Sequence, residues 1–337
     1  MDLVIGSSGC LGAAVCAALL RSGRAVRALD MVATGVPGVD ERIGDMGDAT
    51  RMDEVLRGVD TVHQCASAVS LHPDRRAWLW EMNVAKNRTV LDASRRAGVR
   101  AFVYASTQVL CVRPGEPARG IDERVPYADR PLSAFAACRI ASEKDVLAAN
   151  DPGAGLRTLA LRVPSIYGAR DRYHLPLHLR LADQGLAIRA SDQRHCSHVY
   201  AENAAHAHVL AGDALRAGAP GGAAYYLSDE TPPPSYWDTM EELLVASGRK
   251  PFRGTIPRPV FAALAHISEA LHARLGRVFP GEPRFSYEGL LVAASDCWFR
   301  TDAIRRDLGW APPVAREEAV RRTARWFATN PWPKTLV

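Results

Sequence analysis

Residues 6–12, Gly6-Ser7-Ser8-Gly9-Cys10-Leu11-Gly12, follow a short apolar run, Leu3-Val4-Ile5, and precede a helical pattern over 11–22. Glycines at this spacing allow a tight turn, a close approach of the backbone to a pyrophosphate, and close packing of the helix on the strand. The phosphates would meet free N–H groups and the positive end of the helix dipole. The stretch predicts a dinucleotide-binding turn, with a purely structural turn as the alternative.

The second predicted strand, 25–30, ends at Asp30, eighteen residues after Gly12. A carboxylate at this place accepts hydrogen bonds from both ribose hydroxyls and repels a 2′-phosphate, which favours NAD over NADP. The alternative is a solvated residue at a strand end. Asp45, in Gly44-Asp45-Met46, is expected either to contact the adenine edge or to form a turn.

The first half of the chain alternates β-branched runs with helical patterns, which is typical of βαβ units. We therefore expect an α/β fold, a Rossmann-type doubly wound parallel sheet with a smaller C-terminal substrate-binding cap. The expected units are 1–165, the NAD-binding core, and 166–337, the cap, with some segments returning to the core. Strands are predicted at 2–6, 25–30, 60–65, 100–106 and 156–163, and helices at 11–22, 51–58, 76–97, 133–149, 235–247, 258–278 and 313–328.

Composition excludes several classes of protein. The 337 residues carry a net charge of +5, with 47% apolar and 23% charged residues, which is globular and excludes a disordered chain. Seven cysteines without a C-x-x-C pair predict free thiols in a reducing compartment. No signal peptide is expected, and Pro259–Phe279 holds too many polar residues for a membrane span. Arginines are spread over the chain, so no nucleic-acid partner is expected.

Further motifs occur in a consistent order: Gly44–Asp48, Gly58–Ala66, Phe102–Thr107, Leu161–Gly168, His198–His206 and Asp307–Pro312. Together with Gly6–Gly12 they resemble the extended short-chain dehydrogenases/reductases, in the 3β-hydroxysteroid dehydrogenase-like or NAD-dependent epimerase/dehydratase branch. The resemblance covers nearly the whole chain. It implies NAD as cofactor, a small-molecule substrate, a cytoplasmic location, and a homodimer in which helices 76–97 and 133–149 meet.

The resemblance also implies which residues hold the cofactor. They come from the glycine turn, the ends of the following strands, the catalytic helix and the nicotinamide-side strand: Gly6, Ser8, Gly9, Cys10, Leu11, Gly12, Asp30, Asp45, Met46, Cys65, Ala66, Arg139, Pro164 and Ile166. No metal ligands are expected.

The reaction centre departs from the pattern that the resemblance implies. That pattern is Ser or Thr with a Y-x-x-x-K pair on one helix, where Tyr exchanges the proton and Lys holds the nicotinamide ribose. In this chain Ser106 is kept, whereas Phe135 stands at the Tyr position and Arg139 at the Lys position. Phe135 has no proton to exchange, and Arg139 keeps a cation that can bind the ribose. Tyr127 is a candidate to replace the lost hydroxyl.

Histidines in the expected cap offer other chemistry. His174 and His178 stand at i,i+4, but no carboxylate or Cys has matching spacing, so structural or surface histidines are favoured over a metal site. Cys138 is expected to serve packing rather than as a nucleophile. Three functions remain open: an NAD-dependent oxidoreductase of a small, largely apolar alcohol or ketone, a redox-neutral isomerase, lyase or cyclase, and a non-catalytic nucleotide-binding protein.

Overall fold

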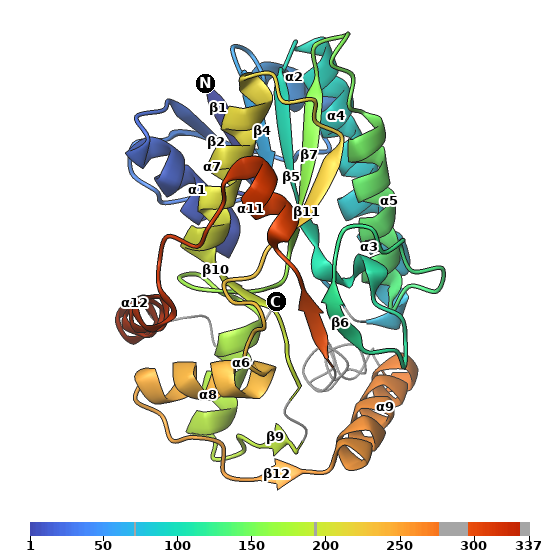
Figure 1. The fold of residues 1–337 in the computed structure, drawn as a ribbon, viewed down its shortest axis with the longest axis vertical. Helices are drawn as coiled ribbons and strands as arrows, with labels where there is room; N and C mark the ends of the chain where they lie inside the picture. Colours follow the sequence, from blue (N-terminus) through green and yellow to red (C-terminus); the bar gives the residue numbers. More distant parts are fainter. Residues whose placement is uncertain (71, 192–193, 276–295, 331–337) are drawn as a thin grey trace.

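A parallel sheet of seven strands forms the centre of the protein (Figure 1). The computed structural model describes residues 1–70, 72–191, 194–275 and 296–330. The strand order, β11-β7-β5-β4-β1-β2-β3, moves outward from β1 in both directions, so the predicted doubly wound sheet is confirmed. The strands are β1 Asp2–Ile5, β2 Val26–Asp30, β3 Asp40–Ile43, β4 Thr61–Gln64, β5 Ala101–Thr107, β7 Arg157–Val163 and β11 Ala223–Tyr226.

Helices cover both faces of this sheet (Figure 1). Helices α1 (Cys10–Arg21), α7 (Ala201–Arg216) and α11 (Asp302–Leu308) pack on one face. The other face is covered by α2 (Ala49–Val55), α4 (Lys86–Arg96) and α5 (Ala134–Ala148). Many small residues of α7 are buried, which lets this helix lie close to the sheet and to α1. The rigid sheet therefore fixes the strand ends from which a site can be built.

The predicted helix over 76–97 is helical but not uniform. After a 3₁₀ turn, η1 (Pro73–Arg75), it consists of α3 (Arg76–Trp80), a π-helical turn η2 (Glu81–Ala85) and α4. Within the π turn the Asn83 side chain lies buried, where its amide donates to Ala68 O at 2.9 Å and its Oδ1 accepts from Ala68 N at 3.0 Å. The irregular turn thus fixes the loop after β4, at the edge of the sheet where the nucleotide is expected.

Helix α5 begins where the sequence predicts. Ser133 is its N-cap, and the Ser133 hydroxyl accepts from Ala136 N at 3.1 Å. Its buried residues include Arg139 and Glu143, one turn apart, which both face the sheet. The helix therefore delivers two charged groups to the end of β5.

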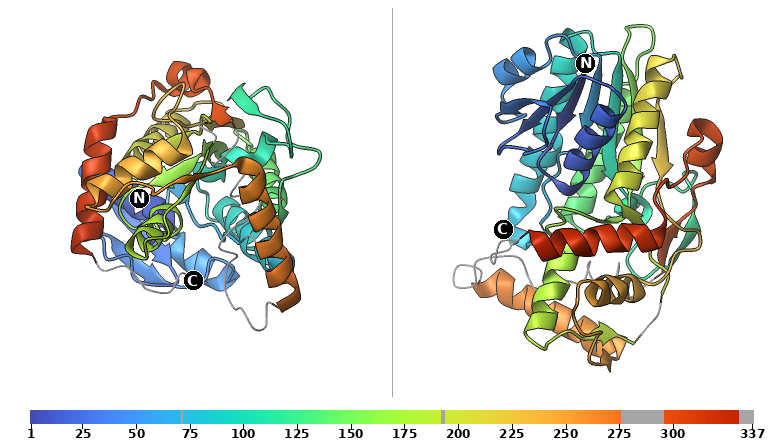
Figure 2. Two further views of the ribbon diagram at one scale, coloured as in Figure 1. Left: turned by 90° about the horizontal axis from the view of Figure 1, so that it is seen from below. Right: turned by 90° about the vertical axis from the view of Figure 1, so that its left-hand side faces the viewer.

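A smaller unit lies beyond the carboxyl ends of the strands (Figure 1). Its core joins α6 (His174–Asp183), α8 (Tyr236–Ala246), the start of α9 (Arg258–Leu275) and α12 (Arg316–Thr329). Helix α12 lies across the boundary with the sheet unit (Figure 2). The segments α7, β11 and α11 lie with the sheet although they follow residue 166. The last predicted residues of the 258–278 helix, 276–278, lie outside the described residues.

Several short elements were not predicted. The edge strand β3 is mostly charged and exposed, so it lacks the apolar alternation that marks a strand. Three two-stranded pairs join distant segments: β8 (Ser165–Tyr167) with β10 (His198–Tyr200), β9 (Arg189–Ala190) with β12 (Thr255–Ile256), and β6 (Ala118–Ile121) with β13 (Cys297–Phe299). A 3₁₀ turn, η3 (Gln108–Cys111), follows β5. Among the described residues, no helix has the length and apolar character needed to cross a bilayer.

Candidate active site

The glycine turn has the backbone that its sequence predicts. Gly6 has a φ of +78°, and a Cβ there would lie 2.5 Å from Ala66 N. A Cβ on Gly12 would overlap Gly6 O, so this glycine allows the helix to pack on the strand end. Gly9 differs, because a Cβ there would meet only Gly6 O at 3.4 Å. The fold therefore requires Gly6 and Gly12, whereas Gly9 leaves open space above the turn.

The first turn of α1 is free to bind an anion. Gly9 is its N-cap residue, and no side chain caps the helix. The N–H groups that follow, from Cys10 onward, are those that a helix cannot satisfy internally. A diphosphate over this turn would accept these hydrogen bonds and meet the helix dipole. The residues present at this turn thus fit a dinucleotide.

Asp30 connects the end of β2 to the glycine turn. Its carboxylate accepts from Ser8 N at 2.9 Å and from Met31 N at 2.7 Å. Each carboxylate oxygen has a second lone pair, so the group keeps acceptors for the two ribose hydroxyls. The structure therefore places Asp30 beside the turn, as the spacing predicts.

The predicted adenine-side and central residues lie at neighbouring strand ends. Asp45 forms an ion pair with Lys86 and accepts from Gly47 N at 2.8 Å. Burial raises the pKa of Asp45, but the hydrogen bond and charge of the Lys86 ammonium lower it by more. The pKa of Asp45 therefore lies below its usual value. Ala66 N donates to Gln64 Oε1 at 2.7 Å, and burial raises the pKa of the neighbouring Cys65 thiol. Sequence reasoning did not predict the role of Lys86 in holding Asp45.

Met46, Pro164 and Ile166 supply apolar walls at two ends of the expected groove. Met46 is 9% exposed and packs with the core cluster under β1 and β4. Pro164 joins β7 to β8, and Ile166 lies in β8, where it is half-buried. The nicotinamide-side segment is therefore apolar at the place where β7 leads into the cap.

A buried carboxylate that sequence reasoning missed organises the contacts of helix α5 with the end of β5. Glu143 is fully buried and accepts from the Ser106 hydroxyl, from the Tyr127 hydroxyl at 2.9 Å and from Arg162 Nη2 at 2.7 Å. Burial favours the neutral form of Arg162, but the Glu143 charge outweighs it and raises the pKa of Arg162. Glu143 stands four residues after Arg139, and that helical spacing was the available signal.

The same network fixes the states of two predicted catalytic residues. Burial and the neighbouring Glu143 charge raise the pKa of Tyr127, so this phenol holds its proton tightly. The hydroxyl groups of Ser106 and Tyr127 both donate hydrogen bonds to Glu143, so neither points its hydrogen toward the expected substrate position. The Lys144 ammonium lies over the Tyr127 ring, 5.1 Å from its centroid. Their catalytic roles therefore stay predictions.

Arg139 retains donors that no protein group uses. Its guanidinium is 2% exposed, donates from Nη2 to Ala105 O and lies 4.7 Å from the centroid of the Tyr104 ring. Its Nε and Nη1 atoms have no hydrogen-bond partner among the described residues. Buried guanidinium donors are costly to leave unpaired, so their arrangement suits a ligand with hydroxyl groups. A nicotinamide ribose fits this requirement.

Phe135 belongs to a small apolar cluster with Leu79, Val84 and Cys138, where it is half-buried. The Cys138 thiol donates to Phe135 O at 3.0 Å, and burial raises its pKa. A protonated thiol in an apolar cluster is a poor nucleophile, which agrees with the packing role predicted for Cys138.

Thr107 is a further hydroxyl at this end of the sheet that sequence reasoning missed. It is the last residue of β5 and is half-buried. Successive strand residues point to opposite faces, so Thr107 points away from the Glu143 network that holds Ser106. Among the described residues its hydroxyl has no recorded partner. The sequence feature that could have revealed Thr107 is the Ser106-Thr107 pair, because two successive strand residues present one hydroxyl to each face of the sheet.

The cap histidines form part of an aromatic core. His178 is buried and its Nε2 lies 2.9 Å from the Tyr236 hydroxyl, while the His198 ring stacks on Tyr236 at 5.7 Å. Burial lowers the pKa of both His178 and His198 to about 3, so both are neutral. Within the described ranges, no three His, Cys, Asp or Glu side chains converge to hold a metal ion. His178 therefore lies within the aromatic core of the cap and not at the surface.

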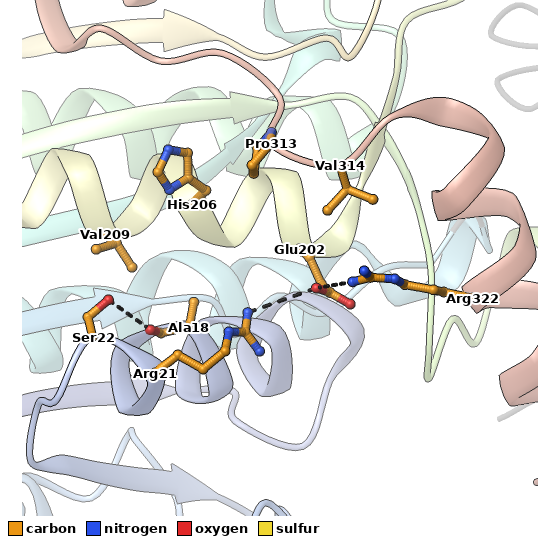
Figure 3. A pocket seen from close by; sticks show the side chains of 9 residues that line it. All are labelled: Ala18, Arg21, Ser22, Glu202, His206, Val209, Pro313, Val314 and Arg322. Carbon is orange, nitrogen blue, oxygen red and sulfur yellow. Dashed lines mark hydrogen bonds and ion pairs between the residues drawn. The ribbon is translucent and has the colours of Figure 1, made fainter.

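A separate surface pocket of about 390 Å³ lies between α1, α7 and α12 (Figure 3). Arg21 and Arg322 converge there on Glu202, at 3.9 Å and 3.1 Å, and Tyr200 donates to the same carboxylate at 2.8 Å. These ion pairs are exposed and contribute little to stability individually. They connect α12 to the sheet unit, and they lie at the last turn of α1, away from its first turn.

Together, the doubly wound sheet, the uncapped first turn of α1 and the cap define an enzyme of the dinucleotide-binding oxidoreductase class. The chain belongs to the 3-beta hydroxysteroid dehydrogenase/isomerase family, which residues 3–255 match. The predicted resemblance is therefore confirmed.

Two curated relatives span almost the full chain. The sterol-4-alpha-carboxylate 3-dehydrogenase, decarboxylating, of Mus musculus is 27% identical over 328 residues, covering 96% of this chain and 90% of its own. The 2-alkyl-3-oxoalkanoate reductase of Stenotrophomonas maltophilia (strain K279a) is 32% identical over 336 residues, covering 95% and 97%.

Solved structures share the fold. The crystal structure of gox2253 has a TM-score of 0.74 at 24% identity and covers 97% of each chain. MoeE5, solved in complex with UDP-glucose and NAD, has a TM-score of 0.72 at 18% identity and covers 96% of this chain and 97% of its own. Identities this low establish the likeness of fold alone.

Proposed function

We propose that this protein is an NAD-dependent oxidoreductase whose substrate is a largely apolar carboxylic acid with an alcohol or ketone on the carbon next to the one that carries the carboxylate. The names of the two curated relatives share this feature. In each, the oxygen function is at position 3, and the neighbouring carbon carries the carboxylate, C4 in the sterol and C2 in the oxoalkanoate. The observation that carries the cofactor assignment is the pair of unpaired Arg139 donors, taken together with the uncapped first turn of α1.

NAD rather than NADP is supported by Asp30, since a carboxylate beside the adenosine ribose repels a 2′-phosphate. Calorimetric titration with NAD and NADP tests this assignment. Tighter binding of NAD is the expected result, and Asp30→Ala should weaken NAD more than NADP. Tighter binding of NADP by the unmodified protein would show that the role given to Asp30 is wrong.

The reaction centre works without a tyrosine. When bound, NAD would supply or accept the hydride. Arg139 would hold its ribose, and the apolar Phe135 cluster would exclude water from one side. Thr107 carries the hydroxyl that is free to donate to the substrate oxygen, while Ser106 and Tyr127 keep Glu143 and the catalytic helix in place. The proton that Tyr would exchange comes from solvent water, so turnover on simple hydroxysteroid or sugar substrates should be slow.

A redox-neutral isomerase, lyase or cyclase is the second candidate, and Phe135 at the position of the family's tyrosine favours it. A deuteride-labelled cofactor separates the two candidates on 2-alkyl-3-oxoalkanoate substrates. Deuterium in the product supports oxidoreduction. Product formed without label and without a net change in NADH absorbance would exclude it.

A homodimer in a reducing, cytoplasmic compartment completes the proposal. All seven cysteines are free thiols, which supports a reducing compartment. Trp78 and Trp80 of α3 are 39% and 47% exposed, and they lie beside α4 and α5, the helices expected to meet in the dimer. Light scattering after gel filtration should give twice the mass of one chain, and a monomer at micromolar concentration would contradict the dimer.

A further inference from the structure

Arg170 occupies a strained position between the sheet unit and the cap. It lies in the turn from β8 to α6 and is the one non-glycine among the described residues with a left-handed backbone, at a φ of 66°. Long side chains rarely adopt this conformation, and such positions persist where the surrounding structure holds them. The next residue, Asp171, fixes the turn by accepting from Tyr173 N at 2.8 Å and Leu175 N at 2.9 Å at the start of α6.

The Arg170 side chain reaches the opposite side of the nucleotide groove. Its Nη1 donates to Thr34 O, in the loop that follows Asp30. Thr34 is 2% exposed, and its hydroxyl donates to Ser7 O in the glycine turn at 2.7 Å. Three segments are thereby joined in series: the turn for the diphosphate, the loop beside the adenosine, and the entry to the cap.

The charge of Arg170 is also close to α1. Burial raises the pKa of the Cys10 and Cys16 thiols, and the Asp171 carboxylate adds to this effect at Cys10. The positive Arg170 side chain partly offsets the rise at both. The Arg170 charge therefore acts on the first two turns of the helix that is expected to meet the diphosphate. A cation at this place favours an anion over the turn.

We propose that Arg170 is a positioning residue that closes the nucleotide groove on its adenosine side and slows the release of the dinucleotide. The inference rests on the proposed function only in taking NAD(H) as the ligand. Because Thr34 is bonded to both Ser7 and Arg170, the adenosine-side loop cannot move outward without breaking this series of contacts. We therefore expect the Arg170 link to act mainly on the dissociation rate.

Stopped-flow displacement measures this rate directly: the protein is loaded with NADH and mixed with excess NAD while NADH fluorescence is followed. Arg170→Ala is expected to speed NADH release about tenfold, as expected for the loss of one charge-assisted contact. Thr34→Val, which removes the hydroxyl link to Ser7, should speed release similarly. If the contacts act in series, the double variant should release NADH no faster than the faster single variant.

Two controls separate this role from loss of charge or of folding. Arg172→Ala removes an exposed neighbouring charge that also acts on Cys10 but has no hydrogen bond to Thr34 among the described residues, so it should change the release rate less than twofold. Arg170→Gly relieves the left-handed backbone, so its melting temperature should match or exceed that of the unmodified protein while release is still faster.

The outcomes distinguish this inference from the proposed function. If the unmodified protein does not bind NADH, both are overturned. If it binds NADH and Arg170→Ala releases it at an unchanged rate, or Arg172→Ala accelerates release as much, the inference alone is wrong.

Discussion

Phe135 and Arg139 lie one turn apart on α5 and define what the reaction centre lacks. The double change Phe135→Tyr with Arg139→Lys adds a phenol and an ammonium at these places. If the protein is an oxidoreductase, NADH oxidation with a 2-alkyl-3-oxoalkanoate should rise about tenfold or more, since a positioned acid contributes about 10²–10⁴-fold. Single-turnover NADH absorbance measures it. Phe135→Leu is the control, which changes the ring without adding a hydroxyl, and an equal gain in that variant would contradict the explanation.

Gly9 and Gly12 separate binding from folding at the same turn. A Cβ on Gly9 has room in the protein itself, whereas one on Gly12 overlaps the backbone of Gly6. We expect Gly9→Val to abolish NAD binding while the urea midpoint stays nearly constant, because the added methyls occupy the space above α1. Gly12→Ala should instead lower the unfolding free energy by about 1–3 kcal/mol. Normal NAD affinity in Gly9→Val would mean that the diphosphate does not lie over this turn.

At the scale of elements, Asp229 joins β10, α7 and the segment before α12. Its carboxylate accepts from Tyr200 N at 2.7 Å and from Asn203 Nδ2 at 2.9 Å. The Asn203 side chain also donates to Val314 O and accepts from Val314 N. Burial raises the pKa of Asp229 to about 7, and the hydrogen bond from Asn203 only partly opposes it. A single half-buried carboxyl thus holds the α12 segment against the sheet unit.

This raised pKa has a defined effect on stability. The stabilising contribution is complete below the unfolded pKa near 3.8 and is lost as the pH rises through about 7. The loss is at most about 4 kcal/mol. Urea unfolding at pH 5 and pH 8 should therefore depend less on pH in Asp229→Asn than in the unmodified protein, although the variant loses one acceptor. An identical pH dependence in both proteins would show that Asp229 is ionised when folded.

At the scale of the whole molecule, three buried histidines make the fold sensitive to acid. His178 and His198 lie in the cap and His208 on the sheet-facing side of α7, and burial lowers the pKa of each, to about 3 for the first two. Their contribution is complete above the unfolded pKa near 6.5 and is lost as the pH falls toward the folded values. The three histidines lose stabilising free energy as the pH falls, whereas Asp229 alone gains it. The net free energy of unfolding should therefore decrease once the pH is below about 6.

Denaturant titrations from pH 7 to pH 4.5 measure this loss. His208→Phe is the informative variant, because neither ring nitrogen of His208 has a hydrogen-bond partner among the described residues. It should remove about half of the net slope of unfolding free energy against pH, since Asp229 offsets one of the three histidine protons and one of the two that remain is no longer taken up. A slope unchanged by His208→Phe would place the acid sensitivity elsewhere.

The glycine spacing, the strand that ends at Asp30 and the alternation of strands with helices are local signals, and they were sufficient for the doubly wound parallel type of sheet, the family and the turn at α1. Such signals are strong because a turn conformation or a periodic pattern of buried residues depends on residues that are close together in the sequence. The edge strand β3 and the small strand pairs escaped them, since these are stabilised by partners far along the chain.

The arrangement of the reaction centre depended on contacts between distant residues. Ser106, Tyr127 and Arg162 are up to 56 positions apart, yet their side chains meet at Glu143, and only the packing of α5 on β5 and β7 shows that two hydroxyls are engaged there while Thr107 faces the other way. The contact of Arg170 with Thr34 spans 136 positions. Side-chain partners of this kind have no local signature, because burial and the crossing of strands determine which groups come within hydrogen-bonding distance.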